Sequence, residues 1–265
     1  MSSSQLFAGT ASYYSRYRPL YPEQIIRRIV DALGLDGRGR LLDVGCGPGT
    51  STFPLEPYFE EVVAIDASPD MIREAEVQAR LRGVTGIEWR VMDADDISEA
   101  LGTFRLISIA SAFHWMNRDL VLARCRDVLD DDGALVLSGG IVSWWESTVP
   151  WHQAVVDVIK GWLGPQRRTA AGAYKTVPYE RFEEALARNR FAISEQNEVS
   201  LTHVWDVDSI VGFLYSTSFA NQGLFGAKLG AFEDELRETL LDLSPSGHFQ
   251  EEITFDYILA RKAAV

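Results

Sequence analysis

The stretch from Arg40 to Thr50 limits the possible folds of this chain more than any other segment. It reads Arg-Leu-Leu-Asp-Val-Gly-Cys-Gly-Pro-Gly-Thr, so an apolar run with one carboxylate, Asp43, is followed by a glycine at every second position. This pattern is typical of a buried strand that ends in a tight loop. Glycine allows positive φ and lacks a Cβ atom, and a helix after the loop offers unpaired N–H groups. The stretch therefore predicts a loop whose backbone lies close against a ligand.

Strand and helix patterns alternate through the first half of the chain. Apolar residues at helical spacing and capping signals predict helices at 22–33, 69–81 and 119–129. Short apolar runs predict strands at 41–44, 62–65, 87–92, 104–111 and 134–138. The fourth run is apolar almost throughout, as in strands that are covered on both faces. This alternation predicts a parallel sheet with helices on both faces, joined by right-handed crossovers.

The alternation breaks after Gly140. Helices are predicted at 150–163, 179–189, 207–217 and 228–243, a loop at 164–178, and further strands at 191–204 and 253–260. We therefore expect an α/β fold with a Rossmann-like, doubly wound, mostly parallel seven-stranded sheet and a helical cap inserted after the fifth strand. Ligands of such sheets bind at the carboxyl ends of the strands.

Three regions follow from this pattern. Residues 1–140 are expected to form the ligand-binding core, 141–190 a helical cap, and 191–265 the final strands together with a further cap segment at 207–243. The core begins with a polar and aromatic stretch that ends in Tyr13-Tyr14-Ser15-Arg16-Tyr17-Arg18. Either a frayed arm or a lid over the site fits that stretch.

Composition excludes several classes of protein. The formal net charge of −13 disfavours nucleic acid and anionic membranes as partners, because phosphate binding needs clusters of Lys and Arg. The two cysteines, Cys46 and Cys125, support neither a disulfide framework nor a zinc cluster. The N-terminus has no signal pattern, and no apolar run is long enough to span a membrane. We expect a cytoplasmic enzyme or binding protein.

Two classes of cofactor use a strand, a glycine loop, a helix and an acidic residue after the second strand. Asp66 stands at that acidic position and suits the ribose hydroxyls of either class. The dinucleotide fingerprint G-x-G-x-x-G would place its third glycine at position 50, which is Thr50. Pro48 also removes a backbone donor that a pyrophosphate would use. The loop therefore favours a ligand without a diphosphate, and a nicotinamide-dependent oxidoreductase is the alternative.

The residues at 41–50 resemble the first motif of class I S-adenosylmethionine-dependent methyltransferases. Asp66 and the pair Asp93-Ala94 fall where the second and third binding positions of that family lie. The stretch from Tyr13 to Pro22 and the segment 112–115 more narrowly resemble a small-molecule branch that includes trans-aconitate-type and ubiquinone-biosynthesis-type enzymes. The resemblance covers residues 10–140 well and the final strands loosely. It implies S-adenosylmethionine as cofactor and S-adenosylhomocysteine as product, and the absence of metal-ligand spacing in the sequence predicts no metal.

The resemblance also implies roles for individual residues on the first two strands. Gly45, Cys46 and Gly47 would pass their backbone under the methionine part of the cofactor, with Asp43 near its amino group. Asp66 would accept hydrogen bonds from both ribose hydroxyls, and the adenine pocket would be lined by Ala67 and Met71.

Further roles fall on the third and fourth strands. Asp93 would accept a hydrogen bond from the adenine amino group, and the Ala94 N–H would meet a ring nitrogen. Ser111 and His114 would face the methionine end and the transferred methyl group. His114 is the candidate general base, because the unperturbed pKa of histidine lies near neutrality. A structural histidine beside Trp115 is the alternative interpretation.

Aromatic residues outside the loop are the candidates for binding the methyl acceptor. Three tryptophans within eight residues favour a partly apolar pocket, and the full set is Tyr14, Trp115, Trp144, Trp145, Trp151, Tyr215, Phe219 and Phe225. We expect a small organic acceptor methylated on a carboxylate or hydroxyl, with N- or C-methylation open, and a monomer or homodimer. A non-catalytic protein that binds S-adenosylmethionine and regulates a partner is a further alternative.

Overall fold

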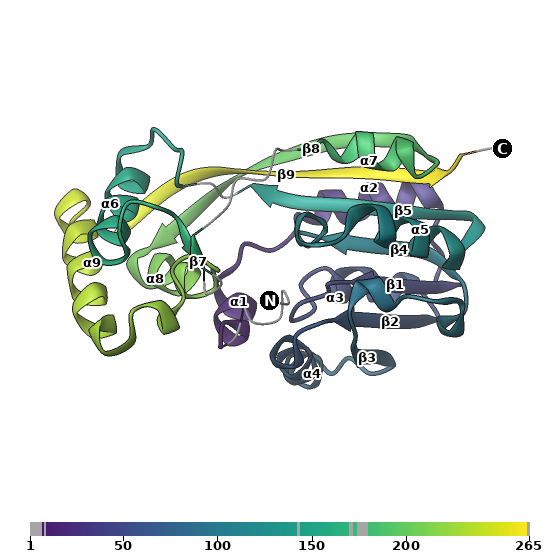
Figure 1. The fold of residues 1–265 in the computed structure, drawn as a ribbon, viewed down its shortest axis with the longest axis horizontal. Coiled ribbons are helices and arrows are strands. Elements are labelled where there is room, and N and C mark those ends of the chain that lie inside the picture. The colour runs from purple at the N-terminus through teal and green to yellow at the C-terminus, as the bar shows by residue number, and fades with distance from the viewer. Residues whose placement is uncertain (1–6, 8, 142–143, 170–171, 174–179, 264–265) are drawn as a thin grey trace. The chain divides into compact units, whose positions relative to one another are not determined.

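The structure is a computed structural model that describes residues 7, 9–141, 144–169, 172–173 and 180–263. One sheet has the strand order β3-β2-β1-β4-β5-β9-β8 (Figure 1). Its strands are β1 (Arg40–Val44), β2 (Glu61–Asp66), β3 (Ile87–Val91), β4 (Phe104–Ala110), β5 (Leu129–Ile141), β8 (Phe191–Asp206) and β9 (His248–Lys262). The pairs from β3 to β5 are parallel, and the arrow of β9 points against that of β5. The predicted mostly parallel seven-stranded sheet is confirmed.

The strand registers bring the predicted site residues to one sheet edge. Val44 of β1 pairs with Ile65 of β2, and Asp66 pairs with Val91 of β3. Because parallel strands all run the same way, the chain leaves β1, β2, β3 and β4 at the same end of the sheet. The glycine loop and the segments after Asp66, Val91 and Ala110 therefore emerge together.

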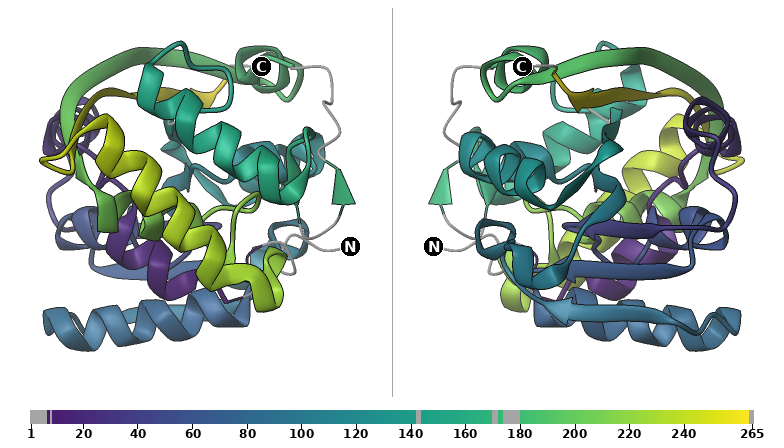
Figure 2. Two further views of the ribbon diagram at one scale, coloured as in Figure 1. Left: turned by 90° about the vertical axis from the view of Figure 1, so that its left-hand side faces the viewer. Right: turned by 90° about the vertical axis from the view of Figure 1, so that its right-hand side faces the viewer.

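Helices cover both faces of the sheet, as Figure 2 shows. Val63 and Ile65 of β2 belong to a large buried cluster with Val121, Leu122 and other residues of α5 (Arg118–Val128). Ala64, between them, points to the opposite face and packs against Ile72 of α4 (Pro69–Arg82). This alternation follows from the two-residue period of a strand, and it explains why nearly every residue of these strands is apolar.

Helix boundaries follow the capping signals of the sequence. Ser68 caps α4 through a hydrogen bond from the Met71 N–H, Pro69 takes its first position, and Gly83 ends it in the left-handed conformation. Gly34 ends α2 (Glu23–Leu33) in the same way. The helix after the glycine loop is short: α3 (Thr52–Leu55) is followed by a single 3-10 turn, Glu56–Tyr58.

Two local predictions were wrong. The acidic run 130–132 was expected to end a helix before a strand at 134, but β5 already begins at Leu129 and contains that run. The carboxylate of Asp131 lies 3.3 Å from Lys262 Nζ and the Asp132 backbone carbonyl accepts from Arg261, so two side chains of β9 contact this acidic part of β5. The predicted loop 164–178 contains β6 (Arg168–Thr169) and β7 (Gly172–Ala173). Of the two alternatives for the N-terminal stretch, a frayed arm does not describe residues 11–17, which form helix α1 (Ala11–Tyr17), and a lid over the site stays a prediction.

The chain divides into two compact units. Unit 1 comprises 1–19, 141–177 and 200–253, and unit 2 comprises 20–140, 178–199 and 254–265. These units do not coincide with the expected regions 1–140, 141–190 and 191–265, which as domain limits stay predictions. Unit 1 contains α1, α6 (Pro150–Leu163), α8 (Val207–Tyr215) and α9 (Leu229–Leu243), and its contacts include α6 with α9 and α1 with α8.

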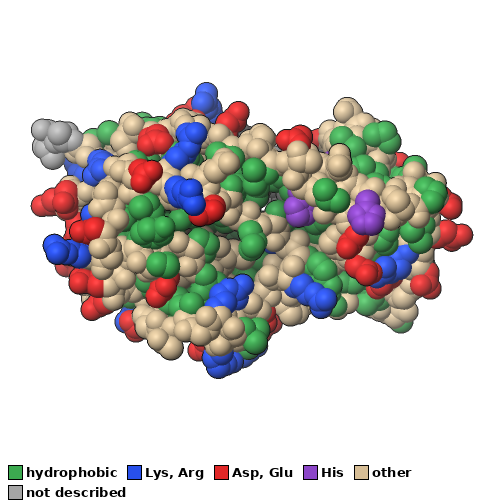
Figure 3. All heavy atoms as spheres, turned by 180° about the vertical axis from the view of Figure 1, so that it is seen from behind, with side chains coloured by type: hydrophobic (Ala, Val, Ile, Leu, Met, Phe, Trp, Pro, Cys, Tyr) green, Lys and Arg blue, Asp and Glu red, His purple; other side chains and the backbone are tan. Residues whose placement is uncertain are grey.

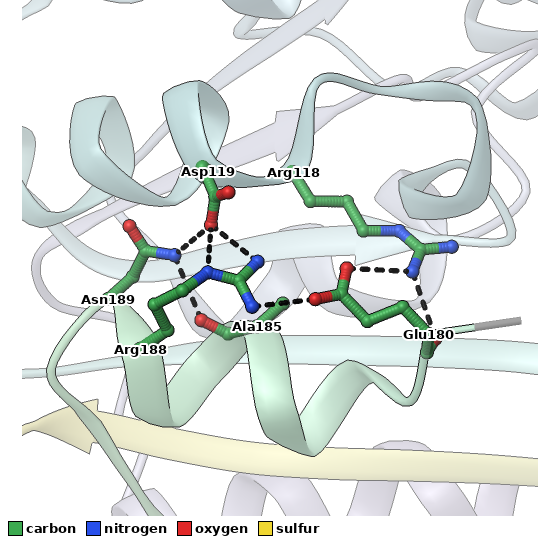
Figure 4. Close-up of polar contacts among 6 residues, drawn as sticks. All are labelled: Arg118, Asp119, Glu180, Ala185, Arg188 and Asn189. Atoms are coloured by element: carbon green, nitrogen blue, oxygen red, sulfur yellow. Dashed lines mark hydrogen bonds and ion pairs between the residues drawn. The ribbon is translucent and has the colours of Figure 1, made fainter. Parts of the chain in front are cut away.

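Helix α7 (Phe182–Arg188) belongs to unit 2, where charged side chains join it to α5 (Figure 4). Arg188 donates from Nη2 to Asp119 Oδ1 over 2.7 Å and from Nη1 to Glu180 Oε1 over 2.6 Å. These bonds with Arg188 hold the pKa of Glu180 below its ordinary value, and bonds from Asn189 and Arg188 do the same for the pKa of Asp119. The apolar partners beneath this network are Ala185 and Leu186, which are fully buried.

The surface carries both signs of charge. Acidic and basic side chains are interspersed on the face drawn in Figure 3. Among the described residues, no helix combines the length and the apolar character that crossing a membrane requires.

Candidate functional site

The glycine loop is tied to β2 by its own backbone. The N–H groups of Gly45 and Cys46 donate to the Ile65 carbonyl over 2.8 and 3.0 Å. Gly45, Gly47 and Gly49 all have positive φ, as the sequence predicts. A Cβ atom at Gly45 would lie 2.6 Å from the Cβ of Ala112, whereas one at Gly47 would have nothing within 4 Å. Gly45 thus serves packing inside the protein, and Gly47 faces open space.

Asp66 fixes the loop from the end of β2. Its Oδ2 accepts from the Gly47 N–H over 2.9 Å and its Oδ1 accepts from the Ser68 N–H over 2.8 Å. Burial raises the pKa of Asp66 above its ordinary value, partly offset by the N–H groups of Ser68 and Gly47 and reinforced by the nearby charge of Asp93. Each carboxylate oxygen has a second lone pair, so this side chain can accept further hydrogen bonds from hydroxyl donors.

Asp43 lies beneath the loop and is fully buried. Its Oδ2 accepts from the hydroxyls of Ser51 and Thr52 over 2.9 and 2.6 Å. Among the described atoms, its buried Oδ1 meets no hydrogen-bond donor at normal geometry. Burial raises the pKa of Asp43 to about 6, while the hydroxyls of Thr52, Ser51 and Ser108 act in the other direction. The structure therefore places this carboxylate as the anchor between β1 and the start of α3.

The acidic run after β3 forms a 3-10 turn, Ala94–Asp96. Asp93 is exposed and caps this turn by accepting the Asp95 N–H over 3.1 Å, while Ala94 is buried. Beyond β2, Ala67 is half-buried and Met71 is buried in the first turn of α4. All four predicted adenine-site residues thus follow β2 or β3 at the sheet edge described above.

Ser111, after β4, adopts a strained backbone. Its φ of 52° lies in the left-handed region, which is uncommon for a residue other than glycine. The Ser111 N–H donates to the Ser138 carbonyl over 2.7 Å, and its hydroxyl contacts the Tyr21 hydroxyl over 2.7 Å. Strain of this kind clusters at functional sites. Sequence reasoning selected Ser111 but did not single out Tyr21, which lies in the stretch from Tyr13 to Pro22 that carries part of the family resemblance.

His114 sits in a 3-10 turn, Phe113–Trp115, directly after this segment. Its side chain is exposed and its ring centroid lies 4.9 Å from that of Trp115. Phe113 is buried and packs edge-on against Phe182 of α7. The turn therefore buries one aromatic side chain as an anchor and leaves His114 accessible to solvent.

Seven of the eight aromatic candidates for acceptor binding lie in unit 1, and four of these are buried. Trp144 and Trp151 are 4% and 7% exposed and pack edge-on against each other, and Tyr215 donates to Glu233 over 2.8 Å. Phe225 stacks on Phe232 of α9. These contacts are those of core residues, and their role in binding stays a prediction.

Four candidates are less buried. Trp145 and Phe219 are half-buried and meet edge-on with ring centroids 5.9 Å apart. The Tyr14 ring lies under the guanidinium of Arg18, with 4.8 Å between the Cζ atom and the ring centroid. Trp115 belongs to unit 2 with His114.

Sequence reasoning also missed a buried polar cluster in unit 1. The carboxylate of Glu251 accepts from the indole nitrogens of Trp144, over 3.1 Å to each oxygen, and of Trp205, over 2.8 Å. His152 Nε2 lies 3.5 Å from Glu251 Oε1, and its Nδ1 contacts the Ser147 hydroxyl over 2.7 Å. Burial lowers the pKa of His152 to about 4 and raises the pKa of Glu251. These residues are scattered in sequence, so no local motif could reveal the cluster.

Within the described part of the chain, no group of three or more His, Cys, Asp or Glu side chains is placed to hold a metal ion. The polar groups that converge are the carboxylates of Asp66 and Asp93 and the loop backbone. Such groups can hold a ligand that offers hydroxyl and amino donors.

Comparison with known families and proteins gives a consistent result. Residues 41–133 match the model of a methyltransferase domain. The chain is 31% identical over 128 residues to the probable S-adenosylmethionine-dependent methyltransferase CRG1 of Saccharomyces cerevisiae, which covers 46% of this chain and 43% of that protein. It is 30% identical over 148 residues to the aklanonic acid methyltransferase DauC of a Streptomyces species, with coverage of 52% and 64%. The matches thus span about half the length of these relatives.

Solved structures share the fold over nearly the whole chain. A structure of a type II methyltransferase from Anaeromyxobacter dehalogenans, described as putative, aligns with a TM-score of 0.55 at 22% identity and covers 93% of this chain and 98% of that one. The [4+2]-cyclase SpnF aligns with a TM-score of 0.57 at 16% identity, with coverage of 100% and 97%. Because these two proteins carry different descriptions, this likeness supports the architecture alone.

Proposed function

We propose that the chain is a class I, S-adenosylmethionine-dependent methyltransferase that transfers a methyl group to a small organic molecule, as the methyltransferase-domain match over residues 41–133 and the likeness to a probable S-adenosylmethionine-dependent methyltransferase support. A carboxylate or hydroxyl oxygen is the favoured acceptor atom, since relatives named O-methyltransferases include a ubiquinone-biosynthesis enzyme and a nocamycin enzyme. The observation that carries the proposal concerns Gly47. Its N–H donates to the Asp66 carboxylate, and the space at its Cβ position is open.

The residues present fit the cofactor on two counts. At Gly47 a Cβ atom would meet no protein atom, so the backbone is accessible there to a ligand. The Asp66 carboxylate is held rigidly by two N–H groups and keeps lone pairs for a ribose diol. The loop 45–47 would then support the methionine part, and Asp43 would act indirectly, by holding the loop through Ser51 and Thr52.

The adenine end would be bound by the segments that follow β2 and β3. Ala67 and Met71 would line the ring, Asp93 would accept its amino hydrogen, and the Ala94 N–H would donate to a ring nitrogen. Asp93 suits this role for two reasons. Its side chain is exposed, and the Asp95 N–H holds its carboxylate in place at the start of a short turn.

The cofactor supplies an electrophilic methyl group when bound. The contribution of the chain is to align the acceptor and exclude water, which suffices for an acceptor that is already a carboxylate or phenolate. For a neutral hydroxyl or an amine, His114 would take the proton, because it is accessible and follows the strained segment at Ser111. The aromatic residues of unit 1 would select the acceptor.

Isothermal titration with S-adenosylmethionine tests the site directly. We expect Asp66→Ala to weaken binding by about 100-fold, since two charge-assisted hydrogen bonds are lost. Asp96→Ala, an exposed carboxylate in the same acidic run, is the matched control and should bind normally. Unchanged affinity in Asp66→Ala would overturn the site.

A thermal shift measurement separates this proposal from the nicotinamide alternative. S-adenosylmethionine and S-adenosylhomocysteine should raise the melting temperature, and NADH and NADPH should not, because only a bound ligand stabilises the folded state. Transfer of labelled methyl from the cofactor to a component of a cell extract would then identify the acceptor. Binding of the cofactor with no transfer to any component would instead favour the regulatory alternative.

A further inference from the structure

Tyr21 lies in unit 2, directly before helix α2, and has no role in the proposed methyl transfer as described above. A residue before proline is restricted to extended conformations, so Pro22 leaves the backbone of Tyr21 little freedom. Pro22 itself is buried and is the N-cap residue of α2. The half-buried Tyr21 side chain is therefore presented from a fixed part of the chain.

The ring of Tyr21 is held by β9. Its centroid lies 5.6 Å from that of Phe255, with 59° between the two ring planes. Phe255 is buried and packs against the backbone of β5, because a Cβ atom at Gly140 would lie 2.8 Å from its ring. All three residues belong to unit 2. The ring is thus fixed by packing in which its hydroxyl group takes no part.

The hydroxyl of Tyr21 meets the residue with the strained backbone. It lies 2.7 Å from Ser111 Oγ, in a hydrogen bond that either oxygen can donate. A residue with a side chain keeps a φ of 52° only where its surroundings hold it there. One hold is the hydrogen bond from the Ser111 N–H to the Ser138 carbonyl, which any residue other than proline could make. The other hold depends on the Tyr21 hydroxyl.

The conformation of Ser111 determines the course of the residues that follow. The next residue, Ala112, lies against the glycine loop, where a Cβ atom at Gly45 would be 2.6 Å from its own Cβ. The Trp115 N–H then donates to the Ala112 carbonyl over 2.9 Å, within the turn that carries His114. A change of φ at Ser111 would therefore move both a contact of the glycine loop and the candidate base.

We propose that Tyr21 is a positioning residue for the methyl transfer. Its hydroxyl holds Ser111 in the left-handed conformation, and through Ser111 it fixes the segment 111–114. This inference rests on the proposed function, in which that segment serves the methionine end of the cofactor while Asp66 and Asp93 serve the ribose and adenine. Loss of the Tyr21 hydroxyl should therefore affect the methionine end alone.

Isothermal titration of the full chain with two ligands tests this role. S-adenosylhomocysteine contains the amino acid part of the cofactor, and methylthioadenosine lacks it but keeps the ribose and adenine. Tyr21→Phe retains the ring against Phe255 and should weaken S-adenosylhomocysteine binding by about 10-fold, the effect of one hydrogen bond. Its affinity for methylthioadenosine should be unchanged, whereas Asp66→Ala should weaken binding of both ligands. Tyr58→Phe removes the hydroxyl of another half-buried tyrosine of unit 2 and should change neither affinity.

Substitutions of Ser111 show whether Tyr21 acts through the backbone there. Glycine adopts a φ of 52° without strain, so in the Ser111→Gly background Tyr21→Phe should cause no further loss of S-adenosylhomocysteine affinity. Ser111→Ala loses the same hydroxyl but keeps the strain, and it should bind more weakly than Ser111→Gly. Any direct contact of the serine hydroxyl with the cofactor is absent from both variants, so their difference reports the backbone conformation.

Three results would overturn the role of Tyr21: normal S-adenosylhomocysteine binding by Tyr21→Phe, an equal loss for both ligands, or the same loss in the Ser111→Gly background. If Asp66→Ala loses binding while Tyr21→Phe binds normally, the cofactor site stands and only the role of Tyr21 fails. Binding of neither ligand by the wild-type chain would overturn the proposed function as well.

Discussion

The two units bury their polar groups in opposite ways. In unit 2, Asp66 accepts hydrogen bonds from the backbone of Gly47 and Ser68, and one oxygen of Asp43 accepts from the hydroxyls of Ser51 and Thr52. In unit 1, Glu251 is satisfied by indole nitrogens that are distant from it in sequence. A carboxylate held by a neighbouring loop is encoded by a short motif, whereas one held by separate helices and strands depends on the whole unit. Perturbing unit 2 should therefore affect one loop, and perturbing unit 1 should affect a whole core.

Gly45→Ala should have the largest effect on stability, and it tests how the glycine loop packs inside the protein. A Cβ atom there would collide with Ala112 at 2.6 Å and would also impose a residue with a side chain on a φ of 68°. We expect a loss of about 3 kcal/mol in the free energy of unfolding, from strain and overpacking together. Gly47→Ala, with φ of 55° and open space, should cost only about 1 kcal/mol while impairing cofactor binding. Chemical denaturation measures both, and equal losses would contradict the division of roles between the two glycines.

Two buried groups, Asp43 in unit 2 and His152 in unit 1, should contribute pH dependences of stability that have opposite signs. Burial raises the pKa of Asp43 to about 6, so this carboxyl binds a proton more tightly in the folded state than in the unfolded state. The stability that results is lost as pH rises from about 4 to 6. Burial lowers the pKa of His152 to about 4, so this imidazole binds a proton more weakly in the folded state than in the unfolded state. Stability is therefore lost as pH falls from 6.5 towards 4. Each shift corresponds to up to about 3 kcal/mol.

Denaturation between pH 4 and 7 measures these two slopes. Asp43→Asn should lose less stability than the wild type when the pH is raised. His152→Gln should lose less stability than the wild type when the pH is lowered. If both variants changed the slope in the same direction, one of the two environments would be wrongly described.

A pair of tryptophan substitutions gives the smallest of the three expected effects and tests the buried cluster of unit 1. Trp144→Phe removes the donor that contacts both oxygens of Glu251, whereas the Trp151 indole nitrogen is buried and meets no acceptor among the described residues. Both rings are almost fully buried, so the loss of volume is similar. We expect Trp144→Phe to be less stable than Trp151→Phe by about 1–2 kcal/mol. Equal stabilities would mean that the carboxylate contributes nothing through Trp144.

The sequence allowed the sheet and the loop to be predicted because their signals are local. Glycine spacing, the proline after Ser68 and apolar strand runs each act over a few residues, and the family model independently covers the same segment. The start of β5 was missed because acidic residues 130–132 are unfavourable in a strand until Arg261 and Lys262 lie beside them. Tyr21 and Glu251 were missed for the same reason, since their partners Ser111 and Trp144 are far away along the chain.

The close approach of Gly45 to Ala112 has an evolutionary consequence. The space between these two positions admits one methyl group, which Ala112 already provides. A larger residue at 112 would push against the loop even if the loop sequence were unchanged. Substitution at either position therefore restricts what the other can accept, and relatives that keep the glycine loop should retain a small residue at 112.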